Sequence, residues 1–228
     1  MQIAVISDVH ANLEGLDEVL KKVKGLELYC LGDFVDYGAE PNEVIDLLRH
    51  RKAHCIAGNH DVATITGDTS LFNARAAMSS KWTQRRLTVD SAQFLKELPL
   101  ELRLTVGGSV LYFTHGSPDD RLWEYVDPRT HESLFGYYLD KVGAKAIGMG
   151  HTHVPFVWRE GERIVFNPGS VGQPRDGDRR ASYAVVSVKE GMMNVEIGRV
   201  EYDYSKTARK IRSAGLPESF AVRLATGN

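Results

Sequence analysis

Three short apolar runs alternate with two helix-like segments at the start of this chain, and this order restricts the folds open to it. The runs cover residues 3–6, 28–31 and 53–57, lengths typical of buried strands. Apolar residues recur at helical spacing over residues 13–23, and a second helix is expected to begin at Pro41. A strand–helix–strand–helix–strand order predicts an α/β fold with a mostly parallel sheet.

The rest of the chain combines a helical segment with several strand pairs. Helical patterns at residues 73–86 and 91–98 predict a helical insertion at about 62–98. We expect strands at residues 102–106, 110–113, 146–149, 155–159, 163–166, 182–188 and 194–200, and helices at 129–142 and 205–214. A length of 228 residues favours a single domain over residues 1–228, with a C-terminal helical tail at about 203–228.

The composition is that of an ordinary globular protein. The net charge of −2 gives no overall field for nucleic acid, so we expect no stable nucleic-acid binding. The sequence has neither a signal-peptide pattern nor an apolar run of about 18 residues, so no membrane association and a cytoplasmic location are expected. Cys30 and Cys55 each lie in an apolar run, which predicts buried free thiols.

Five of the predicted strands are followed by side chains that commonly bind metals. These side chains are Asp8, His10, Asp33, Asn59, His115, His151 and His153. Because the carboxyl ends of strands in an α/β sheet share one crevice, we expect all seven to meet there. A lone Asp-x-His is more often a surface turn or a satisfied polar pair, and a lone Gly-His-x-His is a ligand pair about as often as not, whereas the ordered set of five indicates a metal site.

The types of ligand narrow the chemistry of this site. Carboxylate, amide and imidazole groups without cysteine suit Mn, Fe, Co, Ni or Zn. A carboxylate can bridge two cations, and two such cations can hold a shared hydroxide for in-line attack. The set therefore predicts two divalent transition-metal ions, with Mn expected first.

In their order, these motifs resemble those of the calcineurin-like metallophosphoesterase superfamily. The matching segments are Asp8-x-His10, Gly32-Asp33-x-x-Asp36-x-Gly38, Gly58-Asn59-His60-Asp61, His115, Gly150-His151-x-His153 and Asn167-Pro168-Gly169-Ser170. The last segment resembles a loop of the small bacterial and archaeal members. The resemblance covers about residues 1–200 and implies a two-sheet β-sandwich with helices on both outer faces.

The resemblance also implies a role for each residue. One metal would be held by Asp8, His10, Asp33 and His153, and the other by Asp33, Asn59, His115 and His151, with Asp33 bridging. His60 would protonate the leaving group or stabilise its charge, and Asp36 would orient His60. The alternative for His60 is a structural histidine behind the ligands.

One departure from the family pattern concerns the binding of substrate phosphate. The Ser/Thr protein phosphatases of this superfamily carry an arginine where this chain has Tyr37, which argues against close kinship with them. Arg175, Arg179 and Arg180, in the glycine-rich loop after Ser170, are candidates to bind the phosphate instead. The alternative for these three is a solvated turn.

The function implied is hydrolysis of a phosphate mono- or diester, on a small or nucleotide-like substrate. A dinucleoside polyphosphate hydrolase and, less favoured, a protein phosphatase are alternatives. Trp82, Trp123 and Tyr125 either stack a nucleobase or pack in the core. An interaction scaffold, like the retromer subunit that resembles this fold, and a phosphate sensor without turnover are further alternatives. The intact set of seven ligands and His60 favours the enzyme, and the sequence leaves the oligomeric state open.

Overall fold

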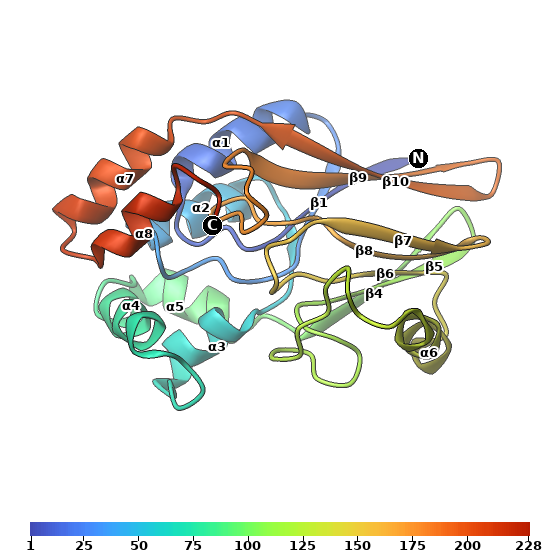
Figure 1. The fold of residues 1–228 in the computed structure, drawn as a ribbon, viewed down its shortest axis with the longest axis horizontal. Coiled ribbons are helices and arrows are strands. Elements are labelled where there is room, and N and C mark those ends of the chain that lie inside the picture. The colour runs from blue at the N-terminus through green and yellow to red at the C-terminus, as the bar shows by residue number, and fades with distance from the viewer.

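Two five-stranded sheets form the centre of the computed structural model, which describes residues 1–228 (Figure 1). The first has the order β10-β9-β1-β2-β3, and its strands are β1 (Gln2–Ile6), β2 (Glu27–Cys30), β3 (His54–Cys55), β9 (Ala181–Lys189) and β10 (Met192–Val200). The second has the order β4-β5-β6-β8-β7, and its strands are β4 (Glu101–Val106), β5 (Ser109–Thr114), β6 (Ala146–Gly148), β7 (Phe156–Glu160) and β8 (Arg163–Asn167).

Eight helices surround the sheets. They are α1 (Leu13–Lys22), α2 (Pro41–His50), α3 (Asn59–Thr66), α4 (Ala74–Gln84), α5 (Val89–Lys96), α6 (Glu132–Val142), α7 (Tyr204–Ser213) and α8 (Glu218–Arg223). None of them combines the length and the apolar character that crossing a bilayer requires. Cys30 and Cys55 are buried free thiols, as predicted.

The buried strand β1 shows how the layers share their cores. Ile3 and Val5 pack between the two sheets, whereas Ala4 and Ile6 face the opposite way, toward α1 and α2. On the outer face of the second sheet, α6 packs through Tyr138. A strand buried on both faces must be apolar throughout, which explains the uninterrupted run of apolar residues. The predicted α/β fold, a two-sheet sandwich with helices on both outer faces, is confirmed.

The prediction of a mostly parallel sheet holds only for part of each sheet. Strands β1, β2 and β3 are parallel, but β9 and β10 pair antiparallel at one edge of the same sheet. The second sheet is also mixed, because the hairpins β4–β5 and β7–β8 flank the parallel strand β6. The parallel strands still end on one side of the molecule, and that is what brings their following loops together.

Helix α3 was not predicted, and it changes how two site residues are presented. Asn59 and His60 lie in its first turn, whereas the sequence pattern placed them on a loop. Helices α4 and α5 lie close to the predicted ranges 73–86 and 91–98. The apolar run at 53–57 forms a strand of only two residues, His54–Cys55, because the chain then turns through Gly58 into α3.

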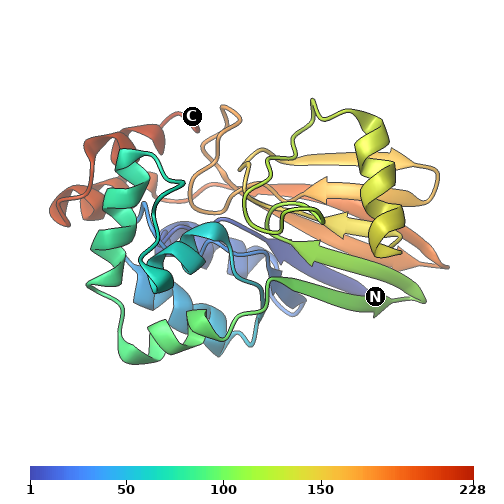
Figure 2. The same ribbon diagram turned by 90° about the horizontal axis from the view of Figure 1, so that it is seen from below.

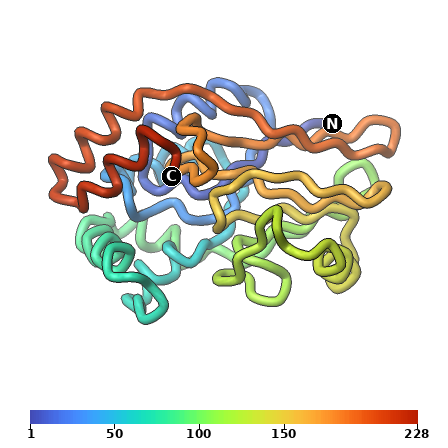
Figure 3. The backbone as a smooth tube through the Cα atoms, in the orientation of Figure 1, coloured from blue at the N-terminus to red at the C-terminus, as the bar shows by residue number.

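The C-terminal helices return to the same end of the molecule as α4. Figures 1 and 2 show α7 and α8 (red) beside α4 (turquoise). Phe220 of α8 packs with Tyr37 and with Ala76 of α4 in one buried cluster. The C-terminus then meets the loop after β8, where the Gly177 amide donates to the Gly227 carbonyl over 2.9 Å (Figure 3). The tail therefore lies against the loops that carry the candidate site.

Candidate metal centre

All seven predicted ligands lie close together at the carboxyl ends of the strands. Asp8, His10 and His153 form one group, and Asp33, His115 and His151 form a second; within each, the ligand atoms lie within 4.8 Å of one another. Asn59 joins the second group, with its Oδ1 3.1 Å from Nε2 of His115. All seven side chains are buried.

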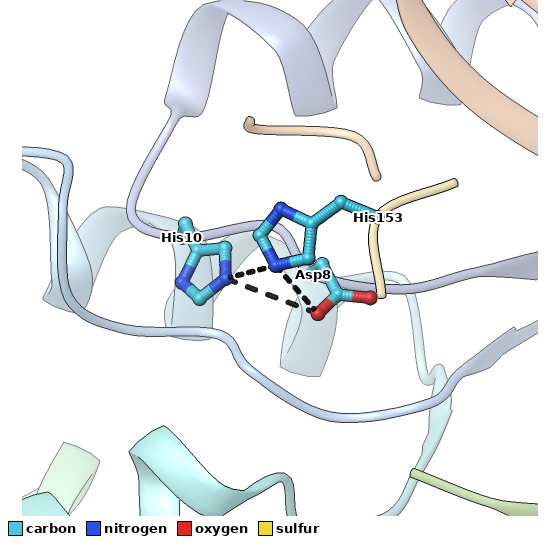
Figure 4. A group of neighbouring side chains, drawn as sticks. All are labelled: Asp8, His10 and His153. Carbon is cyan, nitrogen blue, oxygen red and sulfur yellow. Dashed lines mark hydrogen bonds and ion pairs between the residues drawn. The ribbon is translucent and has the colours of Figure 1, made fainter. Parts of the chain in front are cut away.

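In the first group the two imidazole rings and the Asp8 carboxylate point toward one another (Figure 4). Nδ1 of His10 lies 2.8 Å from the Val35 carbonyl, and Nδ1 of His153 lies 2.6 Å from the Gln173 carbonyl. A carbonyl only accepts, so both Nδ1 atoms carry the proton and both Nε2 atoms are bare. These two Nε2 atoms lie 3.1 Å apart, and the nearby Asp8 Oδ1 is buried without a hydrogen-bond partner. A cation bound between these acceptor atoms would satisfy their lone pairs and remove the repulsion between them. The residues therefore fit a metal ion.

The second group has the same character and is linked to the first through Asp33. Nδ1 of His115 donates to the Leu31 carbonyl over 2.7 Å, which leaves its Nε2 facing Asn59 Oδ1 and, at 3.3 Å, Asp33 Oδ2. The same Asp33 oxygen lies 3.7 Å from Nε2 of His10 in the first group. Asp33 therefore lies between the two groups, which is the position a bridging carboxylate needs.

The buried carboxylates create a strongly negative potential in the cluster. Burial opposes the ionisation of Asp8, but His153 and His115 hold the pKa of this carboxyl below its ordinary range. Burial also opposes the charging of His115, yet Asp33 and Asp8 raise its pKa to about 9. A site that attracts a proton this strongly attracts a divalent cation for the same reason.

The backbone around the cluster is strained in a way common at functional sites. Ten residues other than glycine have positive φ, and eight of them lie in these loops, with φ between 47° and 68°; the eight are Asp8, His10, Ala11, Asp33, Asp36, Tyr37, His151 and His153. Such conformations cost on the order of 1–3 kcal/mol each and persist only where neighbouring contacts impose them. Five of the eight are candidate ligands, so this backbone conformation directs their side chains toward the cluster.

His60 lies beside the cluster in a hydrogen-bonded chain of its own. Its Nδ1 is 2.7 Å from Oδ2 of the buried Asp36, and the Thr64 hydroxyl donates to Asp36 Oδ1 over 3.3 Å. Phe72 stacks on the imidazole, with ring centroids 4.5 Å apart. Burial lowers the pKa of His60, but Asp33 and Asp36 outweigh it and raise the pKa above its ordinary value.

Comparison with known protein families matches residues 1–191 to the calcineurin-like phosphoesterase superfamily domain. The chain belongs to this superfamily. It is 38% identical to an uncharacterized protein of Methanocaldococcus jannaschii, over 99% of this chain and 98% of the relative. Members of the superfamily are phosphoesterases that generally hold two divalent metals, in agreement with the two groups of ligands.

Solved structures agree with this assignment. A metallophosphoesterase from Sphaerobacter thermophilus is 38% identical, with a TM-score of 0.85 over 100% of this chain and 99% of its own. A hypothetical protein from Pyrococcus horikoshii has a TM-score of 0.89 over 100% of this chain and 98% of its own; at 22% identity it supports the fold alone. Both structures cover the whole of this chain, including the C-terminal helices that lie beyond the matched domain of residues 1–191.

The structure separates the three candidate arginines. Arg175 lines the cavity above the cluster, and its guanidinium lies 6.0 Å from the ring of Tyr37, the residue at the family's arginine position. Arg179 lies near Glu201 and over Tyr204, and Arg180 pairs with Asp178. Arg179 and Arg180 line a different cavity, so only Arg175 of the three lies at the cluster.

The three candidate aromatic residues are also separated. Trp123 and Tyr125 line the cavity above the cluster together with Phe72. Trp82 lies elsewhere, because its indole donates to the Ala214 carbonyl over 3.0 Å and its ring packs with the C-terminal helices. Of the three, Trp82 is therefore a packing residue.

Sequence reasoning assigned no role to Asp61 or Ser170, and both hold the site loops together. The Asp61 carboxylate accepts the backbone amides of Asp33, Phe34 and Gly58 over 2.8–2.9 Å. The Ser170 hydroxyl donates to the Asp8 carbonyl over 2.7 Å, which fastens the loop after β8 to the end of β1. The signal for Asp61 was its place three residues after Gly58, where a carboxylate caps a helix.

Gly58 allows the two central loops to approach each other. A Cβ atom at this position would lie 2.1 Å from Asp33 Oδ1 and 2.5 Å from the Asp33 amide nitrogen. Only glycine therefore leaves Asp33 in its place between the two groups.

Proposed function

We propose that this chain is a metal-dependent phosphoesterase that hydrolyses a phosphate mono- or diester of a small or nucleotide-like substrate. The observation that carries the proposal is the convergence of bare imidazole nitrogens and buried carboxylate oxygens around Asp33. Divalent cations bound there would activate water and neutralise charge that develops at phosphorus. Mn is expected first, with Fe, Ni, Co and Zn as alternatives.

The first group, Asp8, His10 and His153, would hold one cation together with Asp33. Asn59, His115 and His151 would hold the other, again with Asp33. The Nε2 atom of His151 lies 3.2 Å from the Trp123 carbonyl, so donation there leaves Nδ1 of His151 as the ligand atom. Backbone carbonyls orient His10, His115 and His153 in the same manner, as is usual for metal-bound histidine.

His60 would act on the leaving group. Nδ1–H of His60 donates a hydrogen bond to the Asp36 carboxylate, which leaves Nε2 as the ring nitrogen free for the substrate. Because its pKa is raised, His60 can carry a second proton on Nε2 and give it to the departing oxygen. His60 lines the cavity with Asp33, Asn59 and His151, so a phosphate at the cluster would lie within its reach.

Arg175 would bind the substrate phosphate, as the protein phosphatases do with the arginine that stands where this chain has Tyr37. It is half-buried, forms no ion pair, and its Nε has no hydrogen-bond partner. An arginine in this condition has donors available for an anionic ligand. We expect Arg175→Gln to lower kcat/KM about 10–100-fold, since a hydrogen bond to a charged group is worth about 1.5–3 kcal/mol.

Steady-state kinetics and metal analysis check this expectation together. The matched control is Arg180→Gln, which removes the same charge from an arginine that pairs with Asp178. Equal kcat/KM values in the two variants would show that Arg175 does not contact the substrate. A loss of bound metal in Arg175→Gln would instead assign it to the support of the ligands.

The cavity above the cluster favours a small substrate with an aromatic part. It has a volume of about 120 Å³, and Phe72, Trp123 and Tyr125 form one side of it. Tyr125 is 64% exposed, and its ring lies 4.1 Å from that of His151, so a flat group has a surface to stack on beside the metals. These features support a nucleotide-like substrate, with dinucleoside polyphosphates as one alternative; a protein phosphatase remains the weaker one because of Tyr37.

Hydrolysis of a panel of esters tests the proposal directly. We expect the metal-stripped protein to be inactive on bis-p-nitrophenyl phosphate and p-nitrophenyl phosphate, and Mn²⁺ to restore turnover of at least one of them. The panel should be repeated with Fe²⁺, Co²⁺, Ni²⁺ and Zn²⁺. Absence of metal-dependent hydrolysis across esters and metals would favour the interaction scaffold or the phosphate sensor, and binding of phosphate without turnover would identify the sensor.

A further inference from the structure

A second group of cationic side chains lies next to the candidate active site, between the C-terminal tail and α4. Arg223 of α8, Arg75 of α4 and Ser219 line a surface cavity of about 360 Å³. Asn73 lines both this cavity and the one above the metal cluster, so the two are adjacent. A ligand long enough to pass Asn73 would reach from the cluster to the second cavity.

Arg223 and Arg175 connect the two cavities through one acceptor. Nη1 of Arg223 and Nη2 of Arg175 lie 2.9 Å and 3.2 Å from the same oxygen, Oε1 of Gln173. The two guanidinium groups are thus neighbours, and burial together with the charges of Arg175 and Arg75 lowers the pKa of Arg223. Like charges placed side by side repel each other unless an anion lies between or beside them.

The protein supplies no such anion. Arg75, Arg175 and Arg223 form no ion pair, although Arg175 and Arg223 are only half exposed and eight other arginines of the chain do pair with carboxylates. Two polar atoms are buried without partners, Nε of Arg175 at the first cavity and Oγ of Ser219 at the second. Unsatisfied donors beside unpaired arginines indicate that a ligand completes the site.

We propose that Arg223, Arg75 and Ser219 form an anion subsite that binds a second phosphate group of the substrate, with Arg175 between this subsite and the metal cluster. The inference rests on the proposed phosphoesterase function and specifies its substrate as a phosphoester that carries at least two phosphate groups. Phosphate is favoured because arginine binds its oxygens through paired N–H donors. The aromatic side of the first cavity then receives the organic part of the same molecule.

Binding to the metal-stripped protein tests the subsite apart from catalysis. With inorganic tripolyphosphate as the probe in isothermal titration calorimetry, we expect Arg223→Gln to weaken binding about tenfold or more. Arg75→Gln, a change at an exposed side chain, should weaken binding in the same direction and guards against a folding defect in the first variant. Arg179→Gln removes the same charge at a distant arginine and should leave binding near that of the wild type.

A kinetic comparison then distinguishes a substrate phosphate from a separate anionic effector. In the metal-loaded protein, the ratio of kcat/KM for diadenosine tetraphosphate to kcat/KM for bis-p-nitrophenyl phosphate should fall about tenfold in Arg223→Gln and stay constant in Arg179→Gln. The proposal would be overturned if all variants bound tripolyphosphate equally well, or if Arg179→Gln weakened binding as much as Arg223→Gln does. An unchanged ratio of the two kcat/KM values in Arg223→Gln would also overturn it. If the wild type hydrolyses neither ester, the phosphoesterase function fails, while the binding result still decides whether the anion subsite exists.

Discussion

Replacing Asp33 by asparagine is expected to reduce metal-dependent ester hydrolysis by about three orders of magnitude or more. The Asp33 Oδ2 atom lies 3.3 Å from Nε2 of His115 and 3.7 Å from Nε2 of His10, so it serves both groups of ligands. Asparagine keeps the size of the side chain but removes the negative charge that lies between the two groups. Loss of a cation forfeits several kcal/mol of transition-state stabilisation, and each 1.36 kcal/mol is a factor of about ten in rate.

Metal content and turnover should change together in this variant. Elemental analysis is expected to find two divalent cations per wild-type chain and one or none in Asp33→Asn. Asp17→Asn is the control, because Asp17 lies on the exposed face of α1 in an ion pair with Lys21. Two retained cations with turnover within tenfold of the wild type would show that Asp33 does not bridge.

The convergence of the seven candidate ligands could be predicted from the sequence, because each of them lies at most five residues after the end of a strand. The end of a buried strand is fixed by the core, so residues such as Asp8 and His115 have little freedom in where they lie. Asn59 and His60 came to the same place although the helix that carries them was not predicted. Whether a loop or a helix follows β3, the chain leaves the strand at the same point. Predicting a loop in place of α3 therefore still placed Asn59 and His60 at the site.

The sequence could not show which arginines lie near the candidate metal site. Arg175, Arg179 and Arg180 lie within six residues in one loop, but only Arg175 faces the cluster, because Asp178 and Glu201 lie beside the other two. Arg223 approaches Arg175 from a helix 48 residues further along, through packing of Phe220 against Tyr37. No local pattern reports contacts of this kind, since they depend on how the tail folds back on the sheets.

His60→Asn is expected to lower kcat about 10²–10⁴-fold for a substrate with an alkoxide leaving group. The Asp36 carboxylate, 2.7 Å from Nδ1, fixes the orientation of the ring and would stabilise the imidazolium that gives up a proton from Nε2. For p-nitrophenyl esters the decrease should be much smaller, because p-nitrophenolate leaves without being protonated. Rates for a series of leaving groups of increasing basicity measure this difference.

The dependence on the leaving group separates the two roles that the sequence left open for His60. A histidine that only supports the ligands would, when replaced, release metal and slow all esters alike. A proton donor would leave two cations in place and slow the esters in proportion to the basicity of the leaving group. Asp36→Asn should follow the same trend more weakly, since it acts through the orientation of His60, and His54→Gln, at an exposed histidine, should change neither quantity. A uniform decrease across leaving groups together with lost metal would therefore remove His60 from the chemical step and leave it as a residue that positions Asn59 in the first turn of α3.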